Sequence, residues 1–189
     1  GDRSALELLG VRNSSVFLSN CTIWVEGITD RLYYRHYLQL YQAFLRENNQ
    51  EFKEFREDYH YSFVEFGGAN ITHFSFLSAE EMPINVERLC SRSFVITDHD
   101  IGSQSTRDAL KEKLQDQCHI LEAKEVENLL TKSVLINVIK KYEQSDPDIV
   151  NFNEQSYKNV YLGSFIEKKL RSKRRLGSYK QDSGTISDK

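Results

Sequence analysis

Four acidic side chains close two short apolar segments, and their spacing suits the binding of a divalent cation. Glu26 and Asp30 lie at the end of the segment CTIWVEGITD. Asp98 and Asp100 lie at the end of a second segment, SFVITDHD. Buried parallel strands have this apolar, β-branched composition, and ligands bind beyond their carboxyl ends. Because carboxylates gathered at one edge repel one another unless a cation lies among them, the pattern predicts a divalent-metal site.

Each acid also has a structural interpretation. Asp30 would lie in the first turn of a helix, where the helix dipole favours a carboxylate. Asp98 and Asp100 could form an Asx turn or cap a helix. Glu26 directly follows Ile-Trp-Val, so its charge needs a partner that compensates for lost hydration. Alternation along an extended chain puts Asp98 and Asp100 on one side and leaves His99 on the other, as a packing or hydrogen-bonding residue.

Strands and helices alternate along the part of the chain that must position these acids. Apolar, β-branched runs predict strands at Thr22–Glu26, Tyr61–Phe66, Phe94–Thr97 and Cys118–Leu121. Helical spacing predicts helices at Ile28–Arg46 and Thr106–Asp116, another beginning within Glu125–Leu130, and more helix beyond Thr131 that resumes near Phe165–Leu176. The alternation indicates an α/β fold, with a parallel sheet of about four strands, helices on both faces and a helical C-terminal extension.

The parallel sheet leads to two expectations about side chains. Ligands of open sheets bind at the carboxyl ends of the strands, which puts Glu122, after the fourth strand, on the same rim as Glu26 and Asp98. The first helix carries an apolar stripe that we expect to pack on the sheet, formed by Tyr33, Tyr37, Leu40, Tyr41 and Phe44.

The composition is that of a folded protein with little net charge. The 189 residues are 39% hydrophobic and have a net charge of −3, which fits one domain with a core and argues against a general nucleic-acid coat. The three cysteines lie far apart, so they suggest neither a disulfide framework nor a zinc site and point to a reducing, cytoplasmic compartment. No apolar run approaches the roughly 20 residues that cross a bilayer, and no signal-peptide pattern opens the chain, so we expect no membrane association.

Basic residues gather near the C-terminus. An acidic pocket cannot attract DNA by itself, so this cluster is a candidate for phosphate binding, although a solvated helix face has the same composition. The cluster comprises Lys168, Lys169, Arg171, Lys173, Arg174 and Arg175.

The motifs around the four acids resemble a known domain. VEGITD followed by a helix, and then a strand that ends in TDHD, resembles the TOPRIM domain of topoisomerases, primases and a group of nucleases. The phrases SSVFLSNCTIWVEGITDRLYYRHYL, FGGAN and LEAKEVENLL are similar to the C-terminal nuclease domain of the OLD (overcoming lysogenization defect) family of ATP-dependent endonucleases. This resemblance covers roughly Val11–Thr131.

The resemblance implies a Mg²⁺-dependent DNA endonuclease in which Mn²⁺ can substitute. By this resemblance Glu26 bridges two ions, Asp30 and Glu127 complete one site, and Asp98 and Asp100 complete the other. A lysine that the family carries near its C-terminal end matches Lys189, which would neutralise charge in the transition state. Glu26, Asp98 and Lys189 are thus the expected catalytic residues.

The resemblance also implies a domain organisation. Residues 1–15 would be a linker from a preceding domain, residues 16–131 the TOPRIM domain, and residues 132–189 a helical extension with a basic tail. The chain lacks a G-x-x-x-x-G-K-[ST] motif, so an ATPase domain would lie elsewhere in a longer chain. DNA, that ATPase domain and further copies of the chain are the expected partners, with defence against phage as a family expectation. The alternatives are a non-catalytic cation-binding or dimerisation module and, less favoured, a primase or topoisomerase domain.

Overall fold

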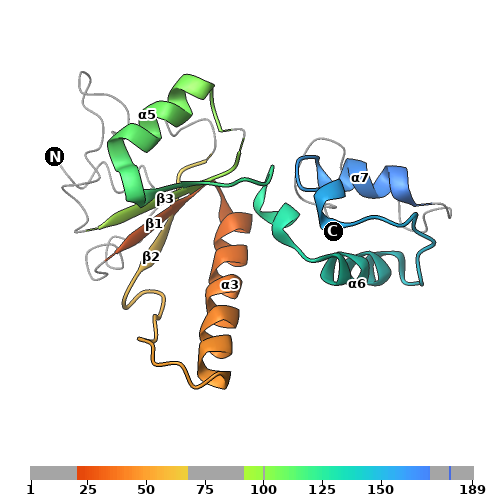
Figure 1. The fold of residues 1–189 in the computed structure, drawn as a ribbon, viewed down its shortest axis with the longest axis horizontal. Helices are drawn as coiled ribbons and strands as arrows, with labels where there is room; N and C mark the ends of the chain where they lie inside the picture. The colour runs from red at the N-terminus through yellow and green to blue at the C-terminus, as the bar shows by residue number, and fades with distance from the viewer. Residues whose placement is uncertain (1–20, 68–91, 100, 171–178, 180–189) are drawn as a thin grey trace. The chain divides into compact units, whose positions relative to one another are not determined.

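The chain forms two compact units, Gly1–Ile120 and Leu121–Lys189. A computed structural model describes residues 21–67, 92–99, 101–170 and 179 (Figure 1). The predicted division into residues 1–15, 16–131 and 132–189 stays a prediction. Among the helices in these described ranges, none is both long and apolar enough to cross a membrane.

The first unit is built on a parallel sheet, which has four strands within the described residues. The strands are β1 (Thr22–Val25), β2 (Ser62–Glu65), β3 (Ser93–Thr97) and β4 (Cys118–Ile120). They lie in the order β2-β1-β3-β4, and each neighbouring pair is parallel. The predicted α/β fold with a Rossmann-like parallel sheet is therefore confirmed.

Strand β1 lies at the centre of this sheet. Trp24 is paired with Val64 of β2 and with Val95 of β3, and all three side chains are almost completely buried. The indole N–H of Trp24 donates a hydrogen bond of 3.1 Å to the Thr22 hydroxyl, which satisfies the polar atom of a buried aromatic ring. Burial on both faces explains why β1 has consecutive apolar residues, Ile23, Trp24 and Val25, instead of an alternating pattern.

Within the described residues, two helices connect strands of the first unit. Helix α3 (Ile28–Glu47) follows β1 and contacts β1 and β2, and α5 (Gln104–Leu114) joins β3 to β4 and contacts β4 (Figure 1). The chain thus moves from β1 to one edge of the sheet and from β3 to the other edge. Right-handed crossovers in opposite directions put the two helices on opposite faces, and they leave a topological switch point between β1 and β3.

The face of α3 that packs on the sheet differs from the predicted one. Tyr34 and Leu38 pack against the core of the first unit, whereas Leu40, Tyr41 and Phe44 are 54%, 59% and 54% exposed. The expectation that the whole stripe covers the sheet is therefore wrong for these three residues. A helix of 20 residues is about 30 Å long, whereas a four-residue strand spans about 13 Å, so the C-terminal part of α3 extends past the sheet.

The second unit is mainly helical. It contains a short 3₁₀ helix, η3 (Val126–Leu129), followed by α6 (Lys132–Glu143) and α7 (Leu162–Lys169). The helix expected to begin within Glu125–Leu130 is thus a single 3₁₀ turn. Helix α6 starts separately at Lys132, and the hydroxyl of its N-cap residue Thr131 accepts a hydrogen bond from the Val134 N–H. The core includes Leu135, Ile139, Phe152, Tyr157, Leu162, Phe165, Ile166 and Tyr179.

Candidate functional site

Two of the predicted acids lie at neighbouring strand ends. Glu26 directly follows β1 and Asp98 directly follows β3, and both are half-buried. These strands are adjacent and parallel, so both acids lie at the same carboxyl end of the sheet, beside its switch point. We call this end of the sheet the acidic edge. The Gly67 N–H donates to the Glu26 carbonyl at 2.8 Å, which continues the β1–β2 pairing past the last strand residue and fixes the backbone at Glu26.

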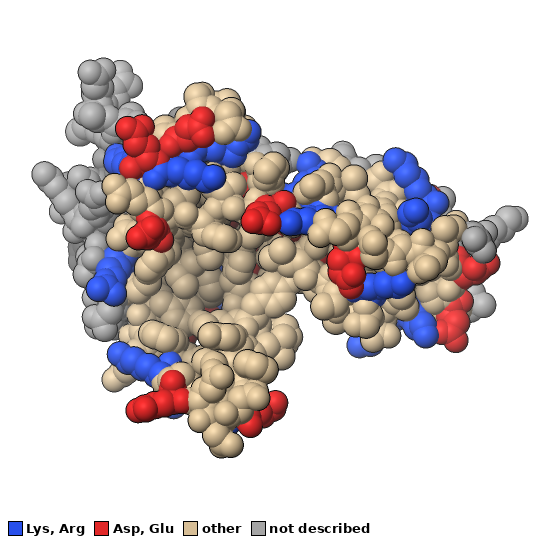
Figure 2. Space-filling model, in the orientation of Figure 1, with Lys and Arg blue, Asp and Glu red and all other residues tan. Residues whose placement is uncertain are grey.

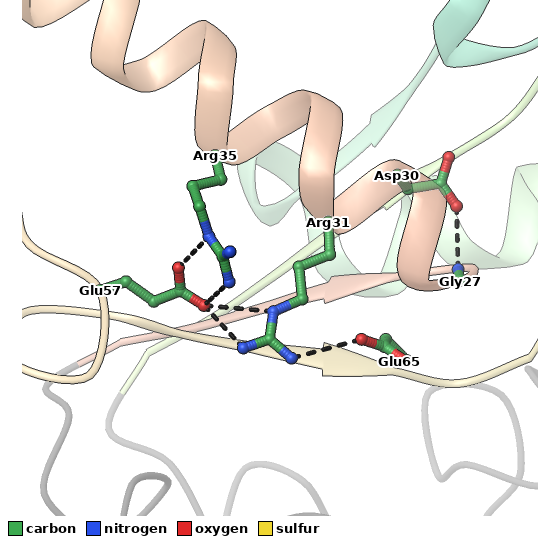
Figure 3. Close-up of polar contacts among 6 residues, drawn as sticks. All are labelled: Gly27, Asp30, Arg31, Arg35, Glu57 and Glu65. Atoms are coloured by element: carbon green, nitrogen blue, oxygen red, sulfur yellow. Dashed lines mark hydrogen bonds and ion pairs between the residues drawn. The ribbon is translucent and has the colours of Figure 1, made fainter.

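Asp30 is held at the start of α3. Its carboxylate accepts a hydrogen bond of 2.8 Å from the Gly27 N–H, and Gly27 is the N-cap residue of the helix (Figure 3). Burial raises the pKa of Asp30, the hydrogen bonds from the backbone oppose that rise, and the charge of Glu65 adds to it. The interpretation of Asp30 as a helix-start residue is confirmed, and its role as a metal ligand stays a prediction.

Glu65 is an acid of this edge that the sequence analysis did not select. It is the last residue of β2, is paired with Val25 of β1, and lies near enough to raise the pKa of Asp30. The signal was present, since YSFVEF is an apolar run with an acid near its end, as in the segments that yielded Glu26 and Asp98.

A network of ion pairs adjoins this edge (Figure 3). Arg31 Nη1 lies 3.4 Å from a carboxylate oxygen of Glu65, and Arg31 Nη2 lies 2.8 Å from one of Glu57. Arg35, one helical turn further along α3, donates to Glu57 through Nε and through Nη2, the latter at 2.8 Å. Burial alone would raise the pKa of Glu57, but the hydrogen bonds and charges of Arg35 and Arg31 outweigh it and lower the pKa.

The remaining predicted site residues lie elsewhere in the chain. Glu127 is buried in η3 of the second unit, and Glu122, also in that unit, forms an ion pair of 2.9 Å with Lys158. Asp100 and Lys189 lie outside the described residues. Of the basic cluster, Lys168 and Lys169 form the last turn of α7, and the other members, Arg171, Lys173, Arg174 and Arg175, also lie outside the described residues.

The residues present meet the requirements of a metal ion only in part. Carboxylates are the ligands that Mg²⁺ prefers, and Glu26, Asp30 and Asp98 all lie in the first unit. Within the described ranges, however, no group of three His, Cys, Asp or Glu side chains is close enough to hold a metal ion. The Mg²⁺ site, and its occupation by Mn²⁺, therefore stay predictions.

Comparisons with protein-family models, with curated proteins and with solved structures gave no match.

Proposed function

We propose that the chain is the nuclease part of a larger ATP-dependent protein and that it hydrolyses DNA phosphodiester bonds with the help of Mg²⁺. The observation that carries this proposal is the position of Glu26 and Asp98 at adjacent strand ends beside the switch point between β1 and β3. Ligands of open α/β sheets bind at that point, and acids there are suited to hard cations rather than to core packing.

In this proposal Glu26, Asp30, Asp98 and Asp100 hold the cation, with Glu127 and Lys189 as the further residues that the family resemblance implies. Bound Mg²⁺, or Mn²⁺ in its place, would activate water and stabilise the leaving 3′ oxygen. The hydrogen bond from the Gly27 N–H orients Asp30, so this carboxylate is held in position before a cation arrives. The raised pKa of Asp30 means that cation binding must compete with a proton at acidic pH.

A plasmid-nicking assay with Mg²⁺ or Mn²⁺ tests the proposal, and it is best run on the full-length protein together with its ATPase domain. We expect Glu26→Gln and Asp98→Asn to reduce nicking by at least about a hundredfold, because each removes a ligand that positions the cation. Glu112→Gln, which changes an exposed acid on α5, is the matched control and should nick at the parent rate. Nicking at the parent rate by Asp98→Asn would reject the proposal.

A second candidate function is that of a non-catalytic module that binds a further copy of the chain. The exposure of Leu40, Tyr41 and Phe44 on one side of α3 favours it, because apolar side chains clustered on a helix surface are typical of interaction sites. Sedimentation velocity separates the two functions. A self-association that Phe44→Ser abolishes, in a protein that neither binds Mg²⁺ nor cuts DNA, would favour the module.

A further inference from the structure

Arg31 and Arg35 of α3 form a pair of guanidinium groups directed at one anion. They are four residues apart, so they project from the same side of the helix (Figure 3). Arg31 donates to Glu57 Oε1 through Nε at 3.2 Å and through Nη2 at 2.8 Å, and Arg35 donates to both oxygens of the same carboxylate. Four N–H donors of two arginines thus surround a single carboxylate.

Two carboxylates balance the charge of the two arginines, and Glu57 is the one that both arginines contact. Two guanidinium groups share Glu57, and the further anion in contact is Glu65, which Arg31 reaches at 3.4 Å. The arginine side chains are 30% and 34% exposed, whereas the Glu57 side chain is 14% exposed. Solvent and ligands can therefore reach the arginines, while the carboxylate occupies the space between them.

Glu57 reaches the arginines from the segment that joins α3 to β2. Gln42 of α3 holds this segment through two hydrogen bonds with the Phe55 backbone, of 2.6 Å and 3.2 Å. The attachment of this segment to α3 therefore does not depend on Glu57 alone. Glu57 also lines an open surface pocket of about 350 Å³, together with Glu54, Arg56, Tyr59 and His60, so its side chain borders on space that it can enter.

Two converging arginines are the arrangement that proteins use to bind phosphate groups in a bidentate manner. We propose that Arg31 and Arg35 bind a backbone phosphate of DNA, and that Glu57 occupies this site as an internal competitor until a phosphate displaces it. The identity of the ligand rests on the proposed nuclease function. The position of the site supplies the connection, because Arg31 contacts Glu65 at the end of β2, a strand that pairs with β1.

The two arginines would provide the positive charge that the acidic edge lacks. On the face seen in Figure 2, Lys and Arg side chains are interspersed with Asp and Glu instead of forming a continuous basic surface. On this face, attraction of DNA would depend on particular basic groups. Arg31 and Arg35 would hold a phosphate beside the acidic strand ends, and Glu57 would weaken binding of short or poorly placed polyanions.

Fluorescence anisotropy of a labelled DNA duplex with the full chain, in EDTA and at several salt concentrations, tests this inference. Glu57→Gln keeps the shape of the side chain and removes its charge, so we expect tighter binding, by about three- to tenfold, as one phosphate contact becomes available. Arg31→Gln combined with Arg35→Gln should weaken binding and reduce the slope of log K against log salt by about 1. Glu54→Gln is the matched control, since it removes one charge from the same segment but pairs with Arg46 and Arg56.

Each outcome decides the question. Equal effects of Glu57→Gln and Glu54→Gln would show a general charge effect and would overturn the inference. The inference would also be overturned if neither the parent nor Glu57→Gln bound DNA. If Glu57→Gln does not fold, Arg31→Lys with Arg35→Lys takes its place, because it keeps both charges and loses the bidentate geometry. Parent-like affinity of that variant would overturn the inference. Because EDTA removes the cation, a failure of nuclease activity leaves this result unaffected.

Discussion

The hydroxyl of Tyr179 donates a hydrogen bond of 2.5 Å to the carboxylate of Glu143, inside the core of the second unit. Tyr179 is 1% exposed and Glu143 is 4% exposed, so a proton donor and its charged acceptor are buried together. The ring of Tyr142 lies 5.0 Å from that of Tyr179. Residue 179 is thereby attached to the end of α6 by packing and by a charge-assisted hydrogen bond.

This pair predicts a loss of stability in alkaline solution. Burial, and then the hydrogen bond and charge of Glu143, raise the pKa of Tyr179 above its ordinary value. The neutral phenol therefore stabilises the folded state fully below the unfolded pKa of about 10, and this contribution is lost as the pH rises above that value. Thermal melts between pH 8 and 11.5 should show a steeper decline for the parent than for Tyr179→Phe. Tyr59→Phe, at a residue that is 71% exposed, should keep the parent slope.

Asp30 predicts a conflict between stability and metal binding. Its pKa is raised in the folded protein, so protonated Asp30 stabilises the fold relative to the charged form. This stabilisation is fully present below the unfolded pKa of about 4, and it is lost as the pH rises through the folded pKa. At pH 7 we expect Asp30→Asn to be as stable as the parent or more so, because the amide oxygen can still accept from the Gly27 N–H. Asp30→Ala loses that bond and should be destabilised by about 0.5–2 kcal/mol in urea unfolding. A marked loss of stability in Asp30→Asn would contradict this account.

Mg²⁺ should stabilise the first unit if the acidic strand ends bind it. A ligand that binds only the folded state adds about 2.7 kcal/mol at a concentration of 100 times its Kd. Differential scanning fluorimetry should therefore show a rise in Tm with Mg²⁺ or Mn²⁺ that chelation reverses. Asp98→Asn should remove the rise and Glu112→Gln should keep it, whereas equal rises in all three proteins would place the cation elsewhere.

The orientation of α3 can be tested with two leucines on the same helix. Leu38 packs against the core that contains Val25 and Phe63, whereas Leu40 is 54% exposed. We expect Leu38→Ala to lower the free energy of unfolding by about 1–2 kcal/mol, since it removes apolar surface from the core. Leu40→Ala should change it by less than about 0.5 kcal/mol. The reverse order would mean that the stripe containing Leu40 faces the sheet after all.

Local chemistry explains why much of the fold could be predicted. Helix α3 begins at Ile28, as expected, because the Asp30 carboxylate accepts from the N–H of the N-cap residue Gly27, and β1 ends where the first charged residue appears. The packing face of α3 could not be predicted in the same way. Periodicity identifies an apolar side of a helix but not the surface that this side meets, and α3 is longer than the strands beneath it.

The candidate site was predictable to a smaller extent. The placement of Glu26 and Asp98 follows from an apolar run and a parallel sheet, both of which are visible in the sequence. The two possible roles of Asp30 require the same residue type at the same position, so sequence alone cannot choose between cap and ligand. Glu57 is separated from Arg35 by 22 residues and from Arg31 by 26, and no local pattern joins residues at such distances.

The central position of Trp24 gives the two units separate spectroscopic reporters. It is the chain's single tryptophan, and its side chain is almost completely buried on a strand that has neighbours on both sides in the first unit. Tryptophan fluorescence, excited at wavelengths where tyrosine does not absorb, would therefore follow the sheet alone. Tyrosine absorbance would also sense the helical second unit through Tyr157 and Tyr179. Denaturation curves from the two signals would coincide if both units melt as one cooperative body, and they would separate if each melts by itself.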